Sequence, residues 1–121
     1  MQRHKLVVLT NPVEGEEERF DAWYMQTHMP DVLRVPGFVS GQRFRWAHAQ
    51  AKDHAQTWRY LTLLEIETDD LQRTLDDLMS RAGTAQMQMS TALADERLAY
   101  VFTAATPVFT AEPGGGLRFL P

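Results

Sequence analysis

The segment FDAWYMQTHMPD (residues 20–31), followed by VPGF (residues 35–38), decides how the rest of the chain is interpreted. Phe20, Tyr24 and His28 are spaced four residues apart, so a helix would place all three on one face. Because phenylalanine is a typical core residue, that face should point into the fold. We therefore expect the His28 imidazole to lie against the fold at the end of an amphipathic helix, where it could carry a proton near neutral pH.

The composition restricts the class of protein. The 121 residues are enough for one domain, and the net charge of -4 with scattered arginines does not indicate a nucleic-acid partner. Cysteine is absent, which excludes disulfides and thiolate metal sites and fits a reducing compartment. The strongly apolar run at residues 6–9 is too short for a signal peptide or a membrane span. We expect a cytoplasmic protein that has no membrane partner.

Hydrophobic periodicity predicts six elements in the order strand, helix, strand, strand, helix, strand. The strands are expected at residues 5–10, 38–47, 57–68 and 97–105, and the helices at residues 14–33 and 69–81. This order is that of a ferredoxin-like α+β fold, in which an antiparallel sheet carries both helices on one face. The domain would comprise residues 1–106, and residues 107–121 would form a C-terminal tail with no core of its own.

Four details of these elements are also predicted. Pro30 should break the first helix near Met29, with a short turn after the break. Strict alternation along the second strand places Phe38, Ser40, Gln42, Phe44 and Trp46 on one face. Thr68 or Asp69 should cap the second helix. Residues 82–94 should either continue that helix or form a short helix of their own, and residues 48–56 should be a hairpin loop.

Three of the predicted strands are apolar on both faces, which one layer of helices does not explain. The runs are LVVL at residues 6–9, LTLL at residues 61–64 and LAYVF at residues 98–102. Since the helices cover one face only, something else must cover the other. A second copy of the same sheet is the simplest cover, so we predict a homodimer whose two sheets pack face to face.

Four short segments carry a resemblance to a known family. They are residues 20–24, 28–31, 36–38 and 43–44, with the aromatic pair, the His-x-Pro-Asp group and the Pro-Gly break in order. In these features the chain resembles the EthD-like branch of the dimeric α+β barrel superfamily. The resemblance implies a dimeric α+β barrel with a ligand cleft between helices and sheet. It also implies a cofactor-independent decarboxylase, cyclase, isomerase or monooxygenase that acts on aromatic or polyketide-like molecules. The site positions that it carries over are His28, Asp31, Trp23 and Tyr24.

Each of these residues has a chemical and a structural interpretation. His28 could act as general acid/base, or it could cap the carbonyls at the end of the helix. Asp31 could orient the imidazole or cap the turn after Pro30. Tyr24 could donate a hydrogen bond to a developing oxyanion, or it could be a core aromatic residue with its hydroxyl at the rim.

The remaining candidates concern binding of the ligand. Trp23 could line the cleft, although core packing is its more ordinary role. Gln42 and Arg43 lie on opposite faces of the second strand, and whichever faces the cleft would bind a ligand oxygen. Arg43 could neutralise a carboxylate there, or it could belong to a surface ion pair.

Three functions fit these observations. The first is a cofactor-independent enzyme that acts on a small hydrophobic, oxygenated aromatic molecule, with His28 as acid/base. The second is a binding or carrier module that uses the same cleft without turnover, and the third is a purely structural dimer. The sequence contains no phosphate-binding loop, dinucleotide fingerprint, nucleophile elbow or closely spaced histidine pair, so we expect no cofactor and no metal.

Overall fold

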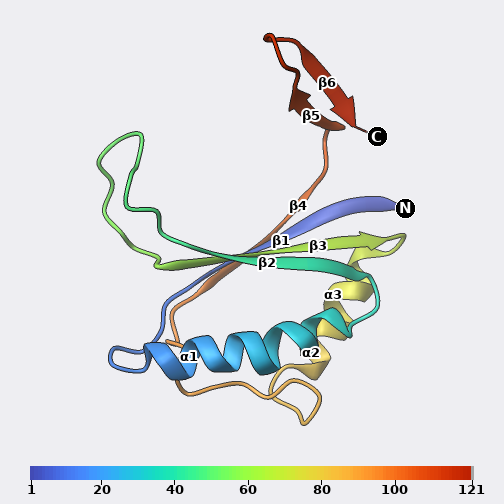
Figure 1. The fold of residues 1–121 in the computed structure, drawn as a ribbon. Coiled ribbons are helices and arrows are strands. Elements are labelled where there is room, and N and C mark those ends of the chain that lie inside the picture. The colour runs from blue at the N-terminus through green and yellow to red at the C-terminus, as the bar shows by residue number, and fades with distance from the viewer. Residues whose placement is uncertain (121) are drawn as a thin grey trace.

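The computed structural model describes residues 1–120 and contains a four-stranded antiparallel sheet with its helices on one face (Figure 1). The elements of this domain are β1 (Gln2–Thr10), α1 (Glu17–Trp23), the π-helical turn η1 (Tyr24–His28), α2 (Met29–Leu33), β2 (Phe38–Arg45), β3 (Tyr60–Thr68), α3 (Leu71–Arg81) and β4 (Leu98–Thr103). The sheet order is β2-β3-β1-β4. The predicted ferredoxin-like α+β class is confirmed.

The strand register determines which side chains meet the helices. Leu6 of β1 lies opposite Leu64 of β3 on one side and Val101 of β4 on the other. These three paired residues face the helix layer. Because side chains alternate along a strand, every second set of paired residues along the sheet faces the helix layer too. Thr62 and Arg43 belong to the next such set, since they are paired between β3 and β2.

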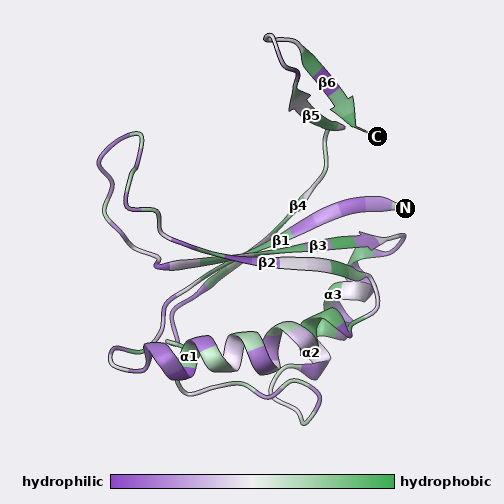
Figure 2. Cartoon of the chain, viewed as in Figure 1, coloured by the Kyte–Doolittle hydropathy of each residue, from purple (hydrophilic) through white to green (hydrophobic). Residues whose placement is uncertain are grey.

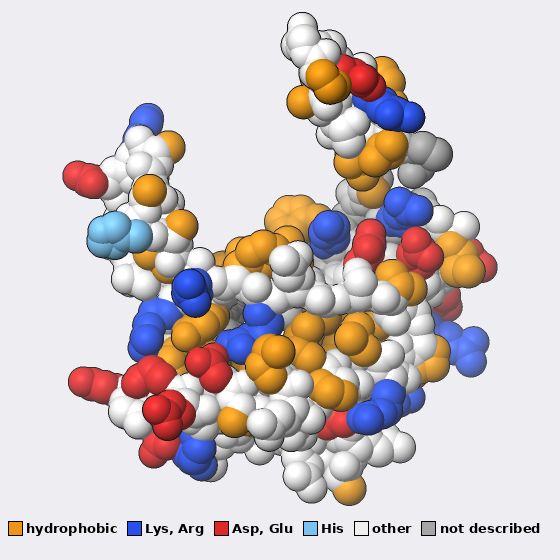
Figure 3. All heavy atoms as spheres, in the orientation of Figure 1, with side chains coloured by type: hydrophobic (Ala, Val, Ile, Leu, Met, Phe, Trp, Pro, Cys, Tyr) orange, Lys and Arg blue, Asp and Glu red, His pale blue; other side chains and the backbone are white. Residues whose placement is uncertain are grey.

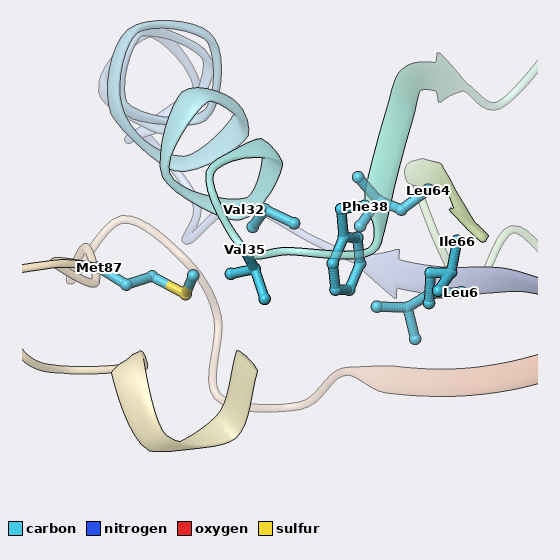
Figure 4. Packing of buried hydrophobic residues seen from close by; sticks show 7 residues of the cluster. All are labelled: Leu6, Val32, Val35, Phe38, Leu64, Ile66 and Met87. Carbon is cyan, nitrogen blue, oxygen red and sulfur yellow. The ribbon is translucent and has the colours of Figure 1, made fainter. Parts of the chain in front are cut away.

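The core lies between the helices and this face of the sheet (Figure 4). Its buried members are Leu6, Val32, Val35, Phe38, Leu64, Ile66 and Met87. Burial of each such side chain contributes about 1.5–3 kcal/mol to folding. A second buried cluster contains Phe20, Tyr24, Ala92 and Leu93, and it fixes the start of the helix layer against the chain that precedes β4.

A bulge in β2 overturns the predicted alternation of that strand. Phe38 pairs with Ile66, whereas Ser40 pairs with Glu65, so one extra residue is inserted between them. The insertion turns Phe38 toward the helices, and Ser40 faces away from them. Gly41 then lies against the helix layer, where an added Cβ would be 2.6 Å from the Cε atom of Met29.

The first helix does not break at Pro30, so that prediction is wrong. The backbone stays helical through His28 and Met29, and the amide of Met29 donates to the carbonyl of Tyr24, five residues earlier. Pro30 has no amide hydrogen to donate, and its ring needs space on the preceding turn. In the wider π-helical turn, the backbone hydrogen bonds join residues five apart instead of four.

The second helix ends at Arg81 as predicted, but the prediction that Thr68 or Asp69 caps its start is wrong. Asp70 is its cap, since its carboxylate accepts a hydrogen bond from the amide of Arg73 at 3.1 Å. Residues 82–94 form neither an extension of this helix nor a helix of their own, so that prediction is wrong. Gly83, with φ +82°, follows the end of α3, and the chain returns along the helices in an irregular path.

The other face of the sheet carries large apolar side chains together with charged ones such as Lys5 and Glu65, and no helix covers it (Figure 1). We call it the open face, and its large apolar residues are Val7, Leu9, Phe44, Leu61, Leu63, Leu98, Tyr100 and Phe102. Tyr100 is 51% exposed and Phe102 is 62% exposed. The prediction that strands β1, β3 and β4 carry apolar residues on both faces is therefore confirmed. The second copy of the chain that would cover the open face stays a prediction.

The C-terminal segment has regular structure. β5 (Val108–Ala111) and β6 (Leu117–Leu120) form a two-stranded hairpin in which the rings of Phe109 and Phe119 are 4.5 Å apart. The hairpin stands away from the sheet in Figure 1. In Figure 2, most of β6 has the green colour of hydrophobic residues. Residue 121 of the expected tail lies outside the described residues. Within residues 1–120, no helix is long and apolar enough to cross a membrane.

Candidate functional site

The π-helical turn brings two aromatic rings against His28. The imidazole stacks on the indole of Trp23 at 4.6 Å and meets the ring of Tyr24 edge-on at 5.1 Å. In a regular α-helix, residues five apart point about 140° away from each other. The wider turn reduces that angle, so Trp23 joins the face that the four-residue spacing assigned to Tyr24 and His28. Such turns occur frequently at functional sites.

His28 is a neutral imidazole in this environment. Burial lowers its pKa from 6.5 to about 4, the charge of Asp31 opposes the shift, and Arg97 adds to it. Its Nδ1 atom is buried and has no hydrogen-bond partner within residues 1–120. A neutral imidazole has one nitrogen that accepts a hydrogen bond and one that donates. At physiological pH the ring can therefore accept a proton or a hydrogen bond.

Tyr24 is a buried phenol that keeps its proton. Its hydroxyl accepts a hydrogen bond from the hydroxyl of Thr62 at 2.9 Å, and the residue is only 2% exposed. Burial raises the pKa of Tyr24, and the Thr62 hydrogen bond and the charge of Arg43 oppose that increase. The phenol thus stays neutral and retains its own hydrogen for donation.

Asp31 is paired with Arg34 at the end of the helix layer. The distance from Arg34 Nη1 to Asp31 Oδ1 is 2.7 Å, so the carboxylate is engaged within its own turn. Its influence on His28 is through charge, which favours the protonated imidazole. This geometry fits the capping interpretation of Asp31 better than direct orientation of the ring.

The structure separates the two polar residues of β2. Arg43 pairs with Thr62 on the helix side, and its guanidinium lies over the ring of Tyr24 at 4.5 Å. Gln42 pairs with Leu63 on the open face. Arg43 is therefore the one that joins Tyr24, whereas Gln42 lines a hollow of about 270 Å³ on the opposite side of the sheet.

Trp23, Tyr24 and His28 pack against one another, and Arg43 lies over Tyr24, but the hollow that Arg43 lines is not lined by the other three. Phe20 is 0% exposed and fills the space beside Tyr24. The hollow that Arg43 lines has a volume of about 370 Å³ and opens at the β2 edge of the sheet. It is lined by Asp21, Met25, Arg43, Phe44, Arg45 and Tyr60. Arg43 reaches this hollow, whereas His28 and Tyr24 are not part of its wall.

Several residues of the site were missed by sequence reasoning. Thr62 is the hydrogen-bond partner of Tyr24, and the main-chain carbonyl of Gln88 accepts a hydrogen bond from the indole of Trp23 at 2.9 Å. Both partners are distant in sequence, so only the fold reveals them. Outside this site, a further histidine, His4 in β1, is buried and hydrogen-bonded to the hydroxyl of Thr103. Extending the alternation of β1 by two residues would have found it.

The part of the chain that the structure describes contains no cluster of three or more His, Cys, Asp or Glu residues that could hold a metal ion. The site itself offers the imidazole of His28, the phenol of Tyr24 and the guanidinium of Arg43. These groups can accept a proton, donate a hydrogen bond and neutralise an anion.

Comparison with known proteins identifies solved structures of similar fold. No family model and no curated protein matches the sequence. A "putative monooxygenase" from Shewanella loihica PV-4 has 12% identity and a TM-score of 0.54, over 84% of this chain and 94% of its own. An EthD family protein from Bacillus halodurans C-125 has 16% identity and a TM-score of 0.45, over 84% and 97% of the two chains. A dimeric ferredoxin-like protein of unknown function from Thermobifida fusca YX has 13% identity and a TM-score of 0.46, over 85% and 92%.

These neighbours bear on the fold and not on the reaction. The structure from Shewanella loihica shares the fold of this chain along most of both chains. An EthD family protein and a dimeric ferredoxin-like protein are also among the structural neighbours. At such low identities the likeness does not assign an activity, a substrate or an assembly to this chain.

Proposed function

We propose that this chain is an EthD-like protein that binds a small hydrophobic, oxygenated molecule and transfers a proton at His28 without a cofactor. The observation that carries the proposal is the state of His28. Its imidazole is neutral, its Nδ1 atom is buried and unpartnered within residues 1–120, and two aromatic rings hold it in place. A neutral imidazole fixed among aromatic rings is suited to take a proton from a phenol or an activated carbon.

The proposed step moves one proton from the ligand to an imidazole nitrogen. The electron pair of the broken O–H or C–H bond stays on the ligand as a phenolate or an enolate. The imidazolium that forms is stabilised by this adjacent negative charge and by the charge of Asp31, and both raise the low pKa of His28. Return of the proton to another atom of the ligand completes an isomerisation, and oxygenation would need dioxygen as the oxidant.

Trp23 and Tyr24 hold the imidazole in one orientation. The indole itself donates a hydrogen bond to the carbonyl of Gln88, so the Trp23 side of the stacked pair is anchored. Tyr24 can donate a hydrogen bond to a developing oxyanion if the ligand displaces its present packing. Asp31 acts from its ion pair with Arg34 through its charge alone.

A second candidate is a non-catalytic binding or carrier module that uses the same residues. The close packing of Phe20 against Tyr24 favours it, because the hollow beside Arg43 is not lined by His28. In that case a ligand in the hollow would contact Arg43 and not His28, and no bond would be made or broken.

We also propose that the protein is a homodimer. The open face exposes large aromatic side chains such as Tyr100 and Phe102, and contiguous apolar surface of this kind marks an interaction site. A second copy related by two-fold symmetry would cover it with an identical sheet.

A ligand screen with product analysis tests the proposed function. Phenols, quinols and anthrone-like compounds would be added separately, and the melting temperature would be measured for each. Compounds that stabilise the protein would then be incubated with it and analysed by mass spectrometry. The proposal predicts that at least one compound binds and is converted. Binding without conversion supports the carrier, and no binding by any class contradicts both candidates.

A further inference from the structure

Arg43 is held in a cage of aromatic rings. Its guanidinium lies over the rings of Tyr24 at 4.5 Å, Tyr60 at 5.2 Å and Phe20 at 5.5 Å. These contacts bury the side chain to 14% exposure and fix its position on β2. A guanidinium stacks well on aromatic faces, but these faces do not provide acceptors for the N–H groups that lie in the plane of the guanidinium.

The hydrogen bonds of Arg43 are incomplete in the described part of the chain. Nη2 donates to Asp21 Oδ1 at 2.9 Å, whereas Nε is buried and has no acceptor. A buried charged donor without an acceptor is unfavourable, and arginine is suited to bind a carboxylate through two parallel hydrogen bonds. The Asp21 side chain is 47% exposed, so its carboxylate is already partly in contact with water.

The hollow beside Arg43 is large enough for a ligand. Its volume of about 370 Å³ lies at the lower end of the range for small-molecule sites, about 300–1,000 Å³. Arg45 adds a second positive charge to the wall, and Met25 and Phe44 provide apolar surface. On the face shown in Figure 3, basic side chains lie between the helix layer and the sheet, next to hydrophobic ones.

We propose that this hollow binds a small aromatic carboxylate, which replaces Asp21 as the partner of Arg43. The exchange of one carboxylate for another keeps the buried guanidinium neutralised throughout. The aromatic part of the ligand would lie on Met25 and Phe44. The proposal concerns binding at the sheet edge and is independent of proton transfer at His28, which is not part of this wall.

The test compares benzoate with benzamide, which has nearly the same shape and no charge. Isothermal titration of the unmodified protein near neutral pH should give benzoate an affinity at least about 10-fold higher, as expected for a charge-assisted pair. Asp21→Asn removes the competing carboxylate and should increase the affinity for benzoate by about 3- to 10-fold. This gain cannot arise from damage to the fold.

Two further variants complete the design. Arg43→Met keeps an unbranched side chain among the rings and should reduce benzoate binding by about 10-fold or more. Arg118→Gln, in the hairpin, removes an exposed arginine elsewhere and should leave the affinity unchanged. Equal binding of benzoate and benzamide, no binding of benzoate, or no gain in Asp21→Asn would each overturn the proposal. The Asp21→Asn result decides the matter if Arg43→Met does not fold.

Discussion

Replacement of His28 by glutamine should make the protein less sensitive to acid. Burial lowers the pKa of His28 to about 4 in the folded state, against 6.5 for an unperturbed histidine. Between these values the unfolded chain binds a proton at this position and the folded chain does not. The free energy of unfolding therefore falls as the pH falls through this window, and the loss stops below about pH 4.

The size of the effect follows from the two pKa values. With 6.5 in the unfolded chain and about 4 in the folded one, His28 lowers the free energy of unfolding by about 2 kcal/mol at about pH 5. Near pH 7.5 the contribution is close to zero, because the imidazole is neutral in both states. Glutamine has no titrating group, so the variant lacks this loss.

The assay is urea unfolding followed by tryptophan fluorescence at about pH 7.5 and about pH 5. The unmodified protein should lose about 2 kcal/mol more than His28→Gln between the two conditions. His48→Gln, in the exposed β2–β3 loop, is the matched control and should behave like the unmodified protein. Equal losses in the unmodified protein and His28→Gln would refute the burial of a neutral imidazole at this position.

Three other predictions concern assembly and packing. Light scattering at micromolar concentration should show a homodimer, and the variant Tyr100→Asp on the open face should be a monomer. A stable monomer of the unmodified protein would count against the predicted interface. Gly41→Val should lower the free energy of unfolding by about 1–3 kcal/mol in urea unfolding, because its Cβ would clash with Met29, and an unchanged midpoint would contradict this packing. Asp70→Ala should cost about 1 kcal/mol in the same assay through loss of the α3 cap, whereas Asp69→Ala should not.

The sheet was predictable because its signals are local. The runs at residues 6–9, 61–64 and 98–102 are apolar on both faces, and the register confirms that each contributes to the core and to the open face. The four-residue spacing of Tyr24 and His28 also predicted their shared side correctly. Both inferences need only the periodicity of a strand or a helix.

The features that escaped prediction depend on contacts between distant segments. The π-helical turn that moves Trp23 onto His28 cannot be distinguished from a regular helix by its apolar spacing. The bulge that turns Phe38 inward depends on its pairing with Ile66 in β3. The same register between β2 and β3 decides that Arg43, and not Gln42, faces the helices. Sequence patterns specify periodicity, whereas register and hydrogen-bond partners follow from the tertiary packing.

The most direct test of the proposed function is the rate at which His28→Gln converts a compound found in the ligand screen. General acid/base catalysis contributes about 10²- to 10⁴-fold, so the account predicts a loss of turnover in that range. The melting temperature near neutral pH should change little, because the imidazole is neutral there and glutamine is also polar. Turnover equal to that of the unmodified protein, measured with the fold intact, would contradict a role for His28 in proton transfer.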